Sequence, residues 1–292
     1  MPFTVVTDTS ANLPTPLLKQ NGVPVLPFTY LVEGEPKVCL DTETFDYGAL
    51  YEAMDRGVKI TTAQINPQTY VDCFRPLLTA GQDVVFVGMS SGISGSLASA
   101  EIARAELAGE FPGRTLCVVD TKGASLGEGI AVLEAIRCRD GGMSAAEAAE
   151  HLRAYCKRIY QVFTVDDLMY LRRGGRLSNA AAVVGTLLGI KPLLKGDPEG
   201  RIVSFGKARS RKAVMEAMVK KYAALAAEPE DQQVCIAHVN CLADAERLAE
   251  AIRAVRPPKD ILLLEYEPVT GSHLGPRALA LFFLGDENVR TK

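Results

Sequence analysis

The sequence predicts an α/β protein with two α/β domains, the first containing a mainly parallel sheet and the second a mixed sheet. Three short apolar runs in the first half, "FTVVTD", "DVVFVG" and "TLCVVD", each end near a hydroxyl or a carboxylate and each precede a helical pattern. Short β-branched runs of this kind are typical of buried strands in a parallel sheet. The alternation therefore predicts a parallel sheet whose polar loops gather along one edge.

The second half of the chain has strands and helices of its own. The pattern changes around Gly141-Gly142, and again after a helix predicted over 145–157 that Ser144 and Glu147 open as a capping box. Strand-like runs such as "VCIAH" and "DILLLEY" follow, together with a long helix predicted over 208–226. We therefore predict domains at 1–157 and 158–292, with the ligand between and within them.

Composition narrows the class of protein. A net charge of −3 over 292 residues, with a pI near 5.8, argues against a nucleic-acid-binding surface. The chain starts directly in a strand-like run, which predicts no signal peptide, and no apolar stretch reaches membrane-spanning length. Its seven cysteines include no C-x-x-C pair, so neither a disulfide framework nor a zinc site is indicated. We expect a soluble cytoplasmic protein with no metal and no cofactor.

A serine-rich stretch, "VGMSSGISGSLASAEIA" over 87–103, follows the second strand-like run. A helical pattern begins at its end, so the five serines lie in a strand-to-helix turn. In an open α/β sheet such a turn presents free backbone N–H groups and a helix N-terminus, which together favour an anion. For Ser90, Ser91 or Ser94 taken singly, helix capping is the simpler interpretation. Phosphate, carboxylate and sulfate remain open as ligands.

Two further stretches place polar groups at comparable positions. Thr61 and Thr62 end a short extended run ahead of a helix with Pro67 near its first turn, which we interpret as a fourth hydroxyl cluster at the same sheet edge. His273 follows a strand and precedes Gly275-Pro276, where we expect another helix to start. This spacing would direct the imidazole at a helix N-terminus and at the anion bound there.

Arg176 has an unusual setting. Leu168 and Leu171 fit a helix that ends at Gly174-Gly175, and Ser178 is a candidate cap for the next helix. Arg176 lies between the glycine pair and this cap, so few orientations are open to its guanidinium. The guanidinium either donates hydrogen bonds to helix carbonyls or contacts an anion or a partner, and both interpretations remain open.

Motifs for several reactions are missing from the sequence. There is no G-x-x-x-x-G-K-[ST] loop, no G-x-G-x-x-G fingerprint and no H-E-x-x-H, and we expect no nucleophile elbow of the G-x-S-x-G kind. The aspartates at strand ends and after them are more often turn caps than metal ligands; they are Asp8, Asp120, Asp166 and Asp167. The basic run over 207–212 is typical of a solvated helix face.

Taken together, these stretches resemble the DegV family, which includes the fatty-acid-binding subunits of bacterial fatty acid kinase. The matching pieces, in family order, are "VVTDTSANLP", "TTAQINP", "SSGISGS", "VVDTKGASLGEG", "DDLMYLRRGGRLS", "GIKPLL" and "GSHLGP". The resemblance implies one long-chain fatty acid, with its carboxylate at the domain junction and its tail in an apolar tunnel. It also implies a separate ATP-dependent kinase subunit that makes the acyl phosphate, a role in phospholipid metabolism, and transient contact with a membrane surface.

The resemblance also assigns individual residues. Thr62 and Ser94 match the hydroxyls that hold the carboxylate, with Gly95 beside them, and His273 matches the histidine near the head group. Arg176 matches the arginine linked to phosphoryl transfer or kinase docking. Thr61 and Ser91 are further candidates for the carboxylate.

One departure from the family pattern affects this assignment. The usual Thr-Ser-Gln-Pro run reads Thr62-Ala63-Gln64-Ile65 here, which leaves open whether Thr61 or Thr62 contacts the carboxylate and how Ala63 and Ile65 shape the tunnel mouth.

Two other functions are weighed against the binding subunit. One is a hydrolase or acyl transferase with Ser94 as nucleophile and His273 as base. The other is a lipid-sensing regulatory protein, which the sequence does not separate from a binding subunit.

Overall fold

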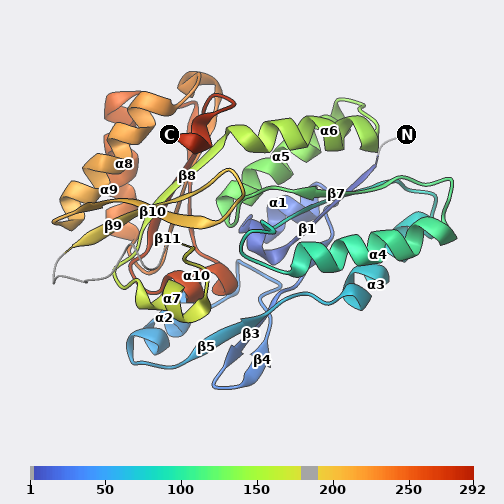
Figure 1. Ribbon diagram of the computed structural model, residues 1–292, viewed down its shortest axis with the longest axis horizontal. Helices are drawn as coiled ribbons and strands as arrows, with labels where there is room; N and C mark the ends of the chain where they lie inside the picture. Colours follow the sequence, from blue (N-terminus) through green and yellow to red (C-terminus); the bar gives the residue numbers. More distant parts are fainter. Residues whose placement is uncertain (1–2, 179–189) are drawn as a thin grey trace.

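The computed structural model describes residues 3–178 and 190–292 (Figure 1). Its first sheet is entirely parallel, with strand order β2-β1-β6-β7. The strands are β1 (Thr4–Asp8), β2 (Val25–Leu26), β6 (Val84–Gly88) and β7 (Leu116–Asp120). Three of them are the three apolar runs identified in the sequence, so the prediction of a mainly parallel sheet is confirmed.

Helices lie on both sides of the parallel sheet. Figure 1 shows α5 and α6 together on one side and α3 and α4 on the other. The helical segments of this half are η1 (Thr9–Ala11), α1 (Thr15–Gln20), α3 (Pro67–Thr79), α4 (Ser96–Glu110), α5 (Leu126–Asp140), α6 (Ala145–Tyr155) and η2 (Cys156–Arg158). The capping box of Ser144 and Glu147 opens α6 as predicted.

A small antiparallel sheet projects beside these layers, with order β4-β3-β5. It contains β3 (Thr29–Val32), β4 (Glu35–Lys37) and β5 (Ile60–Ala63), and α2 (Tyr47–Asp55) lies between β4 and β5 in the chain. Thr61 and Thr62 lie in β5. The expectation that they end a strand of the parallel sheet is therefore wrong, because β5 pairs with β3 instead.

The second half of the chain forms a mixed sheet with order β10-β9-β8-β13-β11-β12. Only β11 and β12 pair in parallel, and the other neighbours are antiparallel, which confirms the predicted mixed sheet. The strands are β8 (Ile159–Thr164), β9 (Lys191–Gly196), β10 (Ile202–Ala208), β11 (Gln233–His238), β12 (Asp260–Glu265) and β13 (Leu279–Leu284). The helical segments are α7 (Met169–Gly174), α8 (Arg211–Leu225), η4 (Pro229–Asp231), α9 (Leu242–Val255), α10 (Pro268–Leu274) and η5 (Val289–Thr291).

The two faces of the mixed sheet have different neighbours. Side chains alternate along a strand, so β8 sends Tyr160 and Val162 to one face and Ile159 and Phe163 to the other. The first face packs against α8 and α9. The second face joins the buried cluster of the first half, so one hydrophobic core runs between the two sheets.

The end of the chain departs from the expected element order. We expected a helix after Gly275-Pro276, but α10 ends at Leu274 and β13 begins at Leu279. Glu267 caps α10 by accepting hydrogen bonds from two backbone N–H groups, and Pro268 occupies the first helical position. His273 therefore lies in the last turn of a helix rather than before one.

The predicted domain boundary near Lys157 coincides with η2, the short turn that leads from α6 into β8. The boundary stays a prediction.

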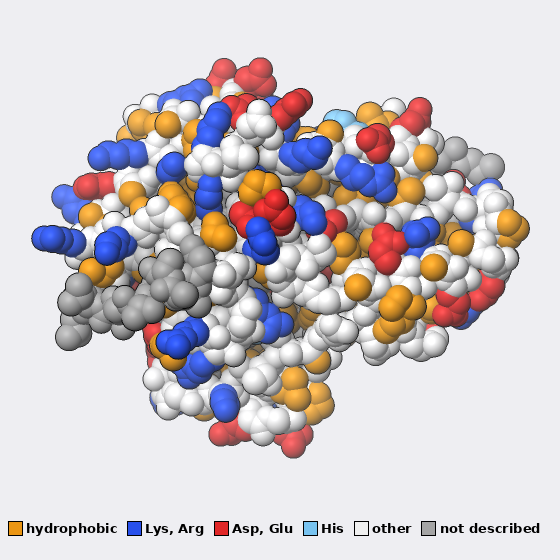
Figure 2. All heavy atoms as spheres, in the orientation of Figure 1, with side chains coloured by type: hydrophobic (Ala, Val, Ile, Leu, Met, Phe, Trp, Pro, Cys, Tyr) orange, Lys and Arg blue, Asp and Glu red, His pale blue; other side chains and the backbone are white. Residues whose placement is uncertain are grey.

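Charged side chains of both signs are interspersed over the face shown in Figure 2. Within residues 3–178 and 190–292, no helix combines the length and the apolar character needed to cross a membrane.

Candidate functional site

A cavity of about 300 Å³ lies where the parallel sheet, the small sheet and the inner face of the mixed sheet meet. Both halves of the chain contribute to its wall. Its apolar lining is supplied by Phe28, Met89, Ile93, Phe163, Leu171, Ile202, Tyr266, Val269, Leu274 and Phe282. A cavity with this lining is suited to an apolar ligand that carries a polar group at one position.

Thr62 and His273 meet on one wall of this cavity. The Oγ1 atom of Thr62 lies 2.8 Å from Nε2 of His273, which joins β5 to α10 across 211 residues of sequence. On its other side, Nδ1 of His273 lies so close to Gly174 that a Cβ atom there would be 2.5 Å away. A glycine at the end of α7 is therefore what allows the imidazole to approach the backbone.

The serine-rich turn supplies the adjacent part of the wall. Ser94 and Gly95 line the cavity, and Gly95 is the N-cap of α4, which has no side-chain cap. The Oγ atom of Ser94 lies 3.1 Å from Oγ of Ser96. Gly95 lies directly against the side chain of Gln64, so a larger residue would collide with the loop after β5. The turn thus directs a helix N-terminus and a hydroxyl at the same cavity.

Ile65 links the loop after β5 to the first turn of α4. Its backbone N–H donates a 3.1 Å hydrogen bond to Oγ of the buried Ser96. A proline at this position would lack that donor. Ile65 itself is buried and does not line the cavity, whereas Ala63 does.

Arg176 lines the cavity next to His273. Its Nε atom donates to the carbonyl of Ile93 at 3.3 Å, and Nη1 donates to the carbonyl of Gly174. The guanidinium therefore bridges the end of α7 and the serine-rich turn. Both interpretations of this residue have a structural basis, since it holds carbonyls and also faces the cavity. The helix that Ser178 would cap lies outside the described residues.

These side chains form one contiguous group, which we name the polar corner: Thr62, Ser94, Gly95, Arg176 and His273. No aspartate or glutamate is among the described residues that line the cavity, whereas Arg176 and Lys122 are. Lys122 is already paired with Asp120 at 2.8 Å. Burial, reinforced by the charge of Arg176, lowers the pKa of His273 to about 4, so its imidazole is neutral at pH 7. The polar corner can therefore donate hydrogen bonds to an anion, and no acidic side chain among the described lining residues competes for those donors.

Two of the predicted site residues lie elsewhere. Thr61 is exposed and does not line the cavity, whereas Thr62 does. Ser91 is also outside the lining. Its hydroxyl donates to Asp120 at 2.5 Å and accepts from Lys122 at 3.1 Å.

The same turn carries a motif that suggests a different chemistry. Residues Gly88 to Gly92 read G-x-S-x-G, with Ser90 at the position of a hydrolase nucleophile. Ser90 is fully buried, donates to the carbonyl of Gly200 at 2.8 Å and is not among the non-glycine residues with a positive φ. The nucleophile of such a hydrolase is exposed and lies on a strained turn, whereas Ser90 is buried and has no positive φ. Ser90 instead joins the first half of the chain to the β9–β10 turn.

Comparison with known proteins decides the family. The family model described as "Uncharacterised protein, DegV family" matches residues 2–286. The chain belongs to the DegV family. A DegV domain-containing protein of Clostridium perfringens is 34% identical over 284 residues, which cover 97% of this chain and 98% of the relative. The resemblance inferred from the sequence motifs is thus confirmed.

Solved structures of DegV proteins share the whole fold. A structure described as fatty acid binding of a DegV family protein from Thermus thermophilus has a TM-score of 0.88 and 31% identity, over 98% of this chain and all of that chain. DegV of Bacillus subtilis, described as a fatty acid binding protein, has a TM-score of 0.81 and 27% identity, over 98% of this chain and all of that chain. The predicted DegV-like α/β fold is confirmed.

A second buried polar group of this DegV chain lies behind the strand ends, and we name it the acid cluster: Asp8, Ser10 and Glu128. The Oγ atom of Ser10 is 2.5 Å from a carboxyl oxygen of Asp8 and 2.6 Å from one of Glu128. A hydroxyl has one hydrogen to donate, so one carboxyl must keep its own proton. Burial raises the pKa of Asp8 to about 6, and burial followed by the charge of Asp8 raises the pKa of Glu128 well above its usual range.

Some lining residues of the DegV cavity were not singled out from the sequence. Gln161 and Phe163 come from β8, and Val269 and Thr270 come from the first turn of α10. The alternation of β8 is visible in the sequence, but its inner face cannot be told from its outer one there. The helix-start signal Glu267-Pro268 was available, and it would have placed α10 before His273.

Proposed function

We propose that this protein binds one long-chain fatty acid in the cavity and presents it to a separate ATP-dependent kinase subunit, which forms the acyl phosphate. The observation that carries the proposal is the polar corner, which combines a cation, hydroxyls and a helix N-terminus at an otherwise mainly apolar cavity. The relatives from Thermus thermophilus and Bacillus subtilis are described as binding fatty acids. The chemistry of the lining fits such a ligand.

The tail of the fatty acid would supply most of the affinity. Burying roughly fourteen methylene groups at about 0.8 kcal/mol each contributes on the order of 11 kcal/mol before the costs of ordering. A carboxylate that leaves water costs several kcal/mol unless it is hydrogen-bonded. The polar corner would offset that cost and orient the head group.

Each corner residue has a distinct part in the proposal. Thr62 and Ser94 donate hydroxyl hydrogen bonds, the N-terminus of α4 at Gly95 adds its dipole, and the neutral His273 positions Thr62 or donates directly. We assign Thr62 rather than Thr61, because only Thr62 lines the cavity. Ser91 takes no part, since Asp120 and Lys122 already engage it.

Arg176 is proposed to act at the step with the kinase. The sequence contains no P-loop of its own, which supports a division of labour with an ATP-binding subunit. Arg176 lines the cavity and is half-buried, so it can reach an approaching phosphoryl group. The proposal places the protein in cytoplasmic phospholipid metabolism, with transient membrane contact when the acid is taken up.

The ligand is proposed to lie at the junction of domains 1–157 and 158–292. Ser94 and Gly95 belong to the first, and Arg176 and His273 belong to the second. A hydrolase that uses Ser94 and His273 has less support, because His273 contacts Thr62 and Ser94 contacts Ser96. A serine-directed covalent probe would label Ser94 only in that case.

The proposal is tested by native mass spectrometry of the purified chain, followed by organic extraction. We expect one fatty acid per chain, whose length and saturation the extract identifies directly. A chain that is empty and also fails to take up added oleate or palmitate would overturn the proposal. Tight fatty acid binding without acyl phosphate, when ATP and the kinase subunit are supplied, would leave a lipid sensor instead.

A further inference from the structure

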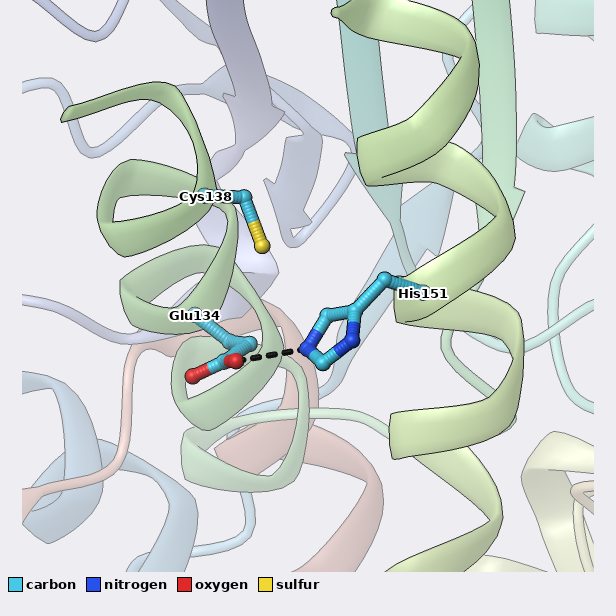
Figure 3. Close-up of side chains that lie close together, drawn as sticks. All are labelled: Glu134, Cys138 and His151. Atoms are coloured by element: carbon cyan, nitrogen blue, oxygen red, sulfur yellow. Dashed lines mark hydrogen bonds and ion pairs between the residues drawn. The ribbon is translucent and has the colours of Figure 1, made fainter. Parts of the chain in front are cut away.

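Three side chains with different donor atoms meet between α5 and α6. Glu134 and Cys138 are one helical turn apart on α5, so both leave the same face of that helix. His151 lies on α6, and Figure 3 shows its ring directed from that helix towards Glu134 on α5, with Cys138 beside them. One donor atom from each residue lies within 4.8 Å of the other two.

The donor set points to a particular class of ion. An imidazole nitrogen, a thiolate sulfur and a carboxylate oxygen are all zinc ligands, whereas Mg²⁺ and Ca²⁺ take oxygen ligands. We propose that Glu134, Cys138 and His151 bind one Zn²⁺ ion, with water as the fourth ligand. Zinc sites with three protein ligands keep the fourth position for water or a substrate.

Neighbouring residues hold two of the three ligands in position. Glu134 is 2.7 Å from Nε2 of His151 through one oxygen and 2.5 Å from Nη2 of Arg137 through the other. Arg137 also donates to the hydroxyl of Tyr155 at 3.2 Å, and the ring of Tyr155 lies 5.8 Å from that of His151. Such outer partners orient metal ligands and set their basicity.

Zinc binding requires a change in protons at this site. A ligating imidazole is neutral, so when Nε2 of His151 binds the ion its single hydrogen lies on Nδ1, and bonds from both residues to the ion replace the contact between Nε2 and Glu134. The thiol of Cys138 must lose its proton to become a ligand, and binding therefore releases that proton to solvent. Cys138 is 4% exposed, whereas the His151 side chain is 40% exposed, so the ion enters from the imidazole side.

The zinc site is separate from the proposed fatty acid site. None of its three ligands lines the cavity. Helix α5 begins beside Ser125, which does line the cavity, and the zinc ligands lie in its second half. Failure of this inference would thus leave fatty acid binding unaffected, and the converse also holds.

The test is titration of the chelator-treated full chain with Co²⁺, a spectroscopic substitute for zinc. We expect sulfur-to-cobalt charge-transfer absorption and tetrahedral d–d bands that saturate at one ion per chain, and Zn²⁺ should displace the Co²⁺. A folded chain that gives no such absorption would overturn the proposal.

Three variants identify the ligands. Cys138→Ser should abolish the charge-transfer absorption, and His151→Ala should weaken Zn²⁺ binding by more than the roughly 10–100-fold that loss of an outer-shell partner costs. Cys73→Ser is the matched control, since Cys73 is a half-buried cysteine on α3, and it should leave both readings unchanged. His151 is exposed, so its variant is expected to fold even if Cys138→Ser does not. Unchanged zinc affinity in folded His151→Ala would contradict the assignment.

Discussion

The acid cluster is fully buried and the polar corner is half-buried, and among the described residues the first lacks a cation where the second lacks an anion. The acid cluster brings two carboxyls to one hydroxyl, and no described lysine or arginine forms an ion pair with Asp8 or Glu128. The polar corner brings a guanidinium, a neutral imidazole and hydroxyls to a cavity wall on which the described residues include no acid. The first group can be completed by retaining a proton. In the proposed function, the carboxylate of the fatty acid completes the second.

Among the variants that test this comparison, Arg176→Ala is expected to show the largest effect. Loss of a donor aimed at developing charge typically lowers a rate by about 100- to 1000-fold, and we expect at least the lower value for acyl phosphate formation with the kinase subunit and ATP. Fatty acid affinity should change only a few-fold, because the hydroxyls and the α4 N-terminus remain.

The matched control for that prediction is Arg173→Ala, an exposed arginine that lies over the ring of Tyr170 at 5.1 Å. It should leave the rate unchanged. Loss of fatty acid binding in a folded Arg176→Ala chain would instead make Arg176 a head-group ligand.

The acid cluster predicts an intermediate effect, which is a change in the free energy of unfolding with pH. Burial raises the folded-state pKa of Asp8 from 3.8 to about 6 and, elsewhere, that of Glu267 to about 8. A raised carboxyl pKa favours the folded state below the unfolded value, near 4, and this contribution is lost as the pH rises through the folded value. For Asp8 alone the loss is on the order of 3 kcal/mol over the whole titration, from below pH 4 to above pH 6. Urea unfolding at a series of pH values measures it.

Glu128→Gln sharpens this test, because an amide can donate to Ser10 as a protonated carboxyl does, yet does not titrate. The free energy of unfolding of this variant should fall less steeply over the same pH range. An identical slope in the two proteins would mean that the acid cluster does not hold the proton.

Ser94→Ala is expected to have the smallest effect. A hydrogen bond to a charged group contributes about 1.5–3 kcal/mol, which corresponds to a roughly 10- to 150-fold loss of fatty acid affinity. Ser91→Ala is the control, since it removes a hydroxyl of the same turn that bonds Asp120 and lies outside the cavity lining. Fluorescent fatty acid displacement compares the two variants. Equal affinities would remove Ser94 from the head-group site.

The sequence predicted those parts of the fold that depend on local pattern. The apolar runs became β1, β6 and β7, and the glycine pair ended α7 with Gly175 in the left-handed region. Pairing across long distances could not be predicted in the same way. The run that contains Thr62 is extended as expected, but whether it joins the parallel sheet or β3 depends on partners that no local pattern specifies.

Candidate site residues were found where a hydroxyl or glycine stood out from its surroundings. Ser94, Gly95, Thr62, Arg176 and His273 all line one cavity, and their roles towards a carboxylate stay a prediction. The acid cluster was missed because Asp8 and Glu128 are 120 residues apart and each fits an ordinary helix or turn. Glu134, Cys138 and His151 were missed for a similar reason, since a spacing of four on one helix and a distant histidine form no short motif.

The order of strands in the mixed sheet has a consequence for synthesis. Strand β13 is last in the chain, yet it lies between β8 and β11, so a ribosome delivers an inner strand of that sheet after its neighbours on both sides. At about 5–20 residues per second, Thr62 emerges roughly 10 to 40 s before His273. A nascent chain would therefore hold half of the polar corner without the other half. In the proposed function, capture of the fatty acid must therefore wait until translation has passed β13, which also supplies Phe282 to the cavity wall.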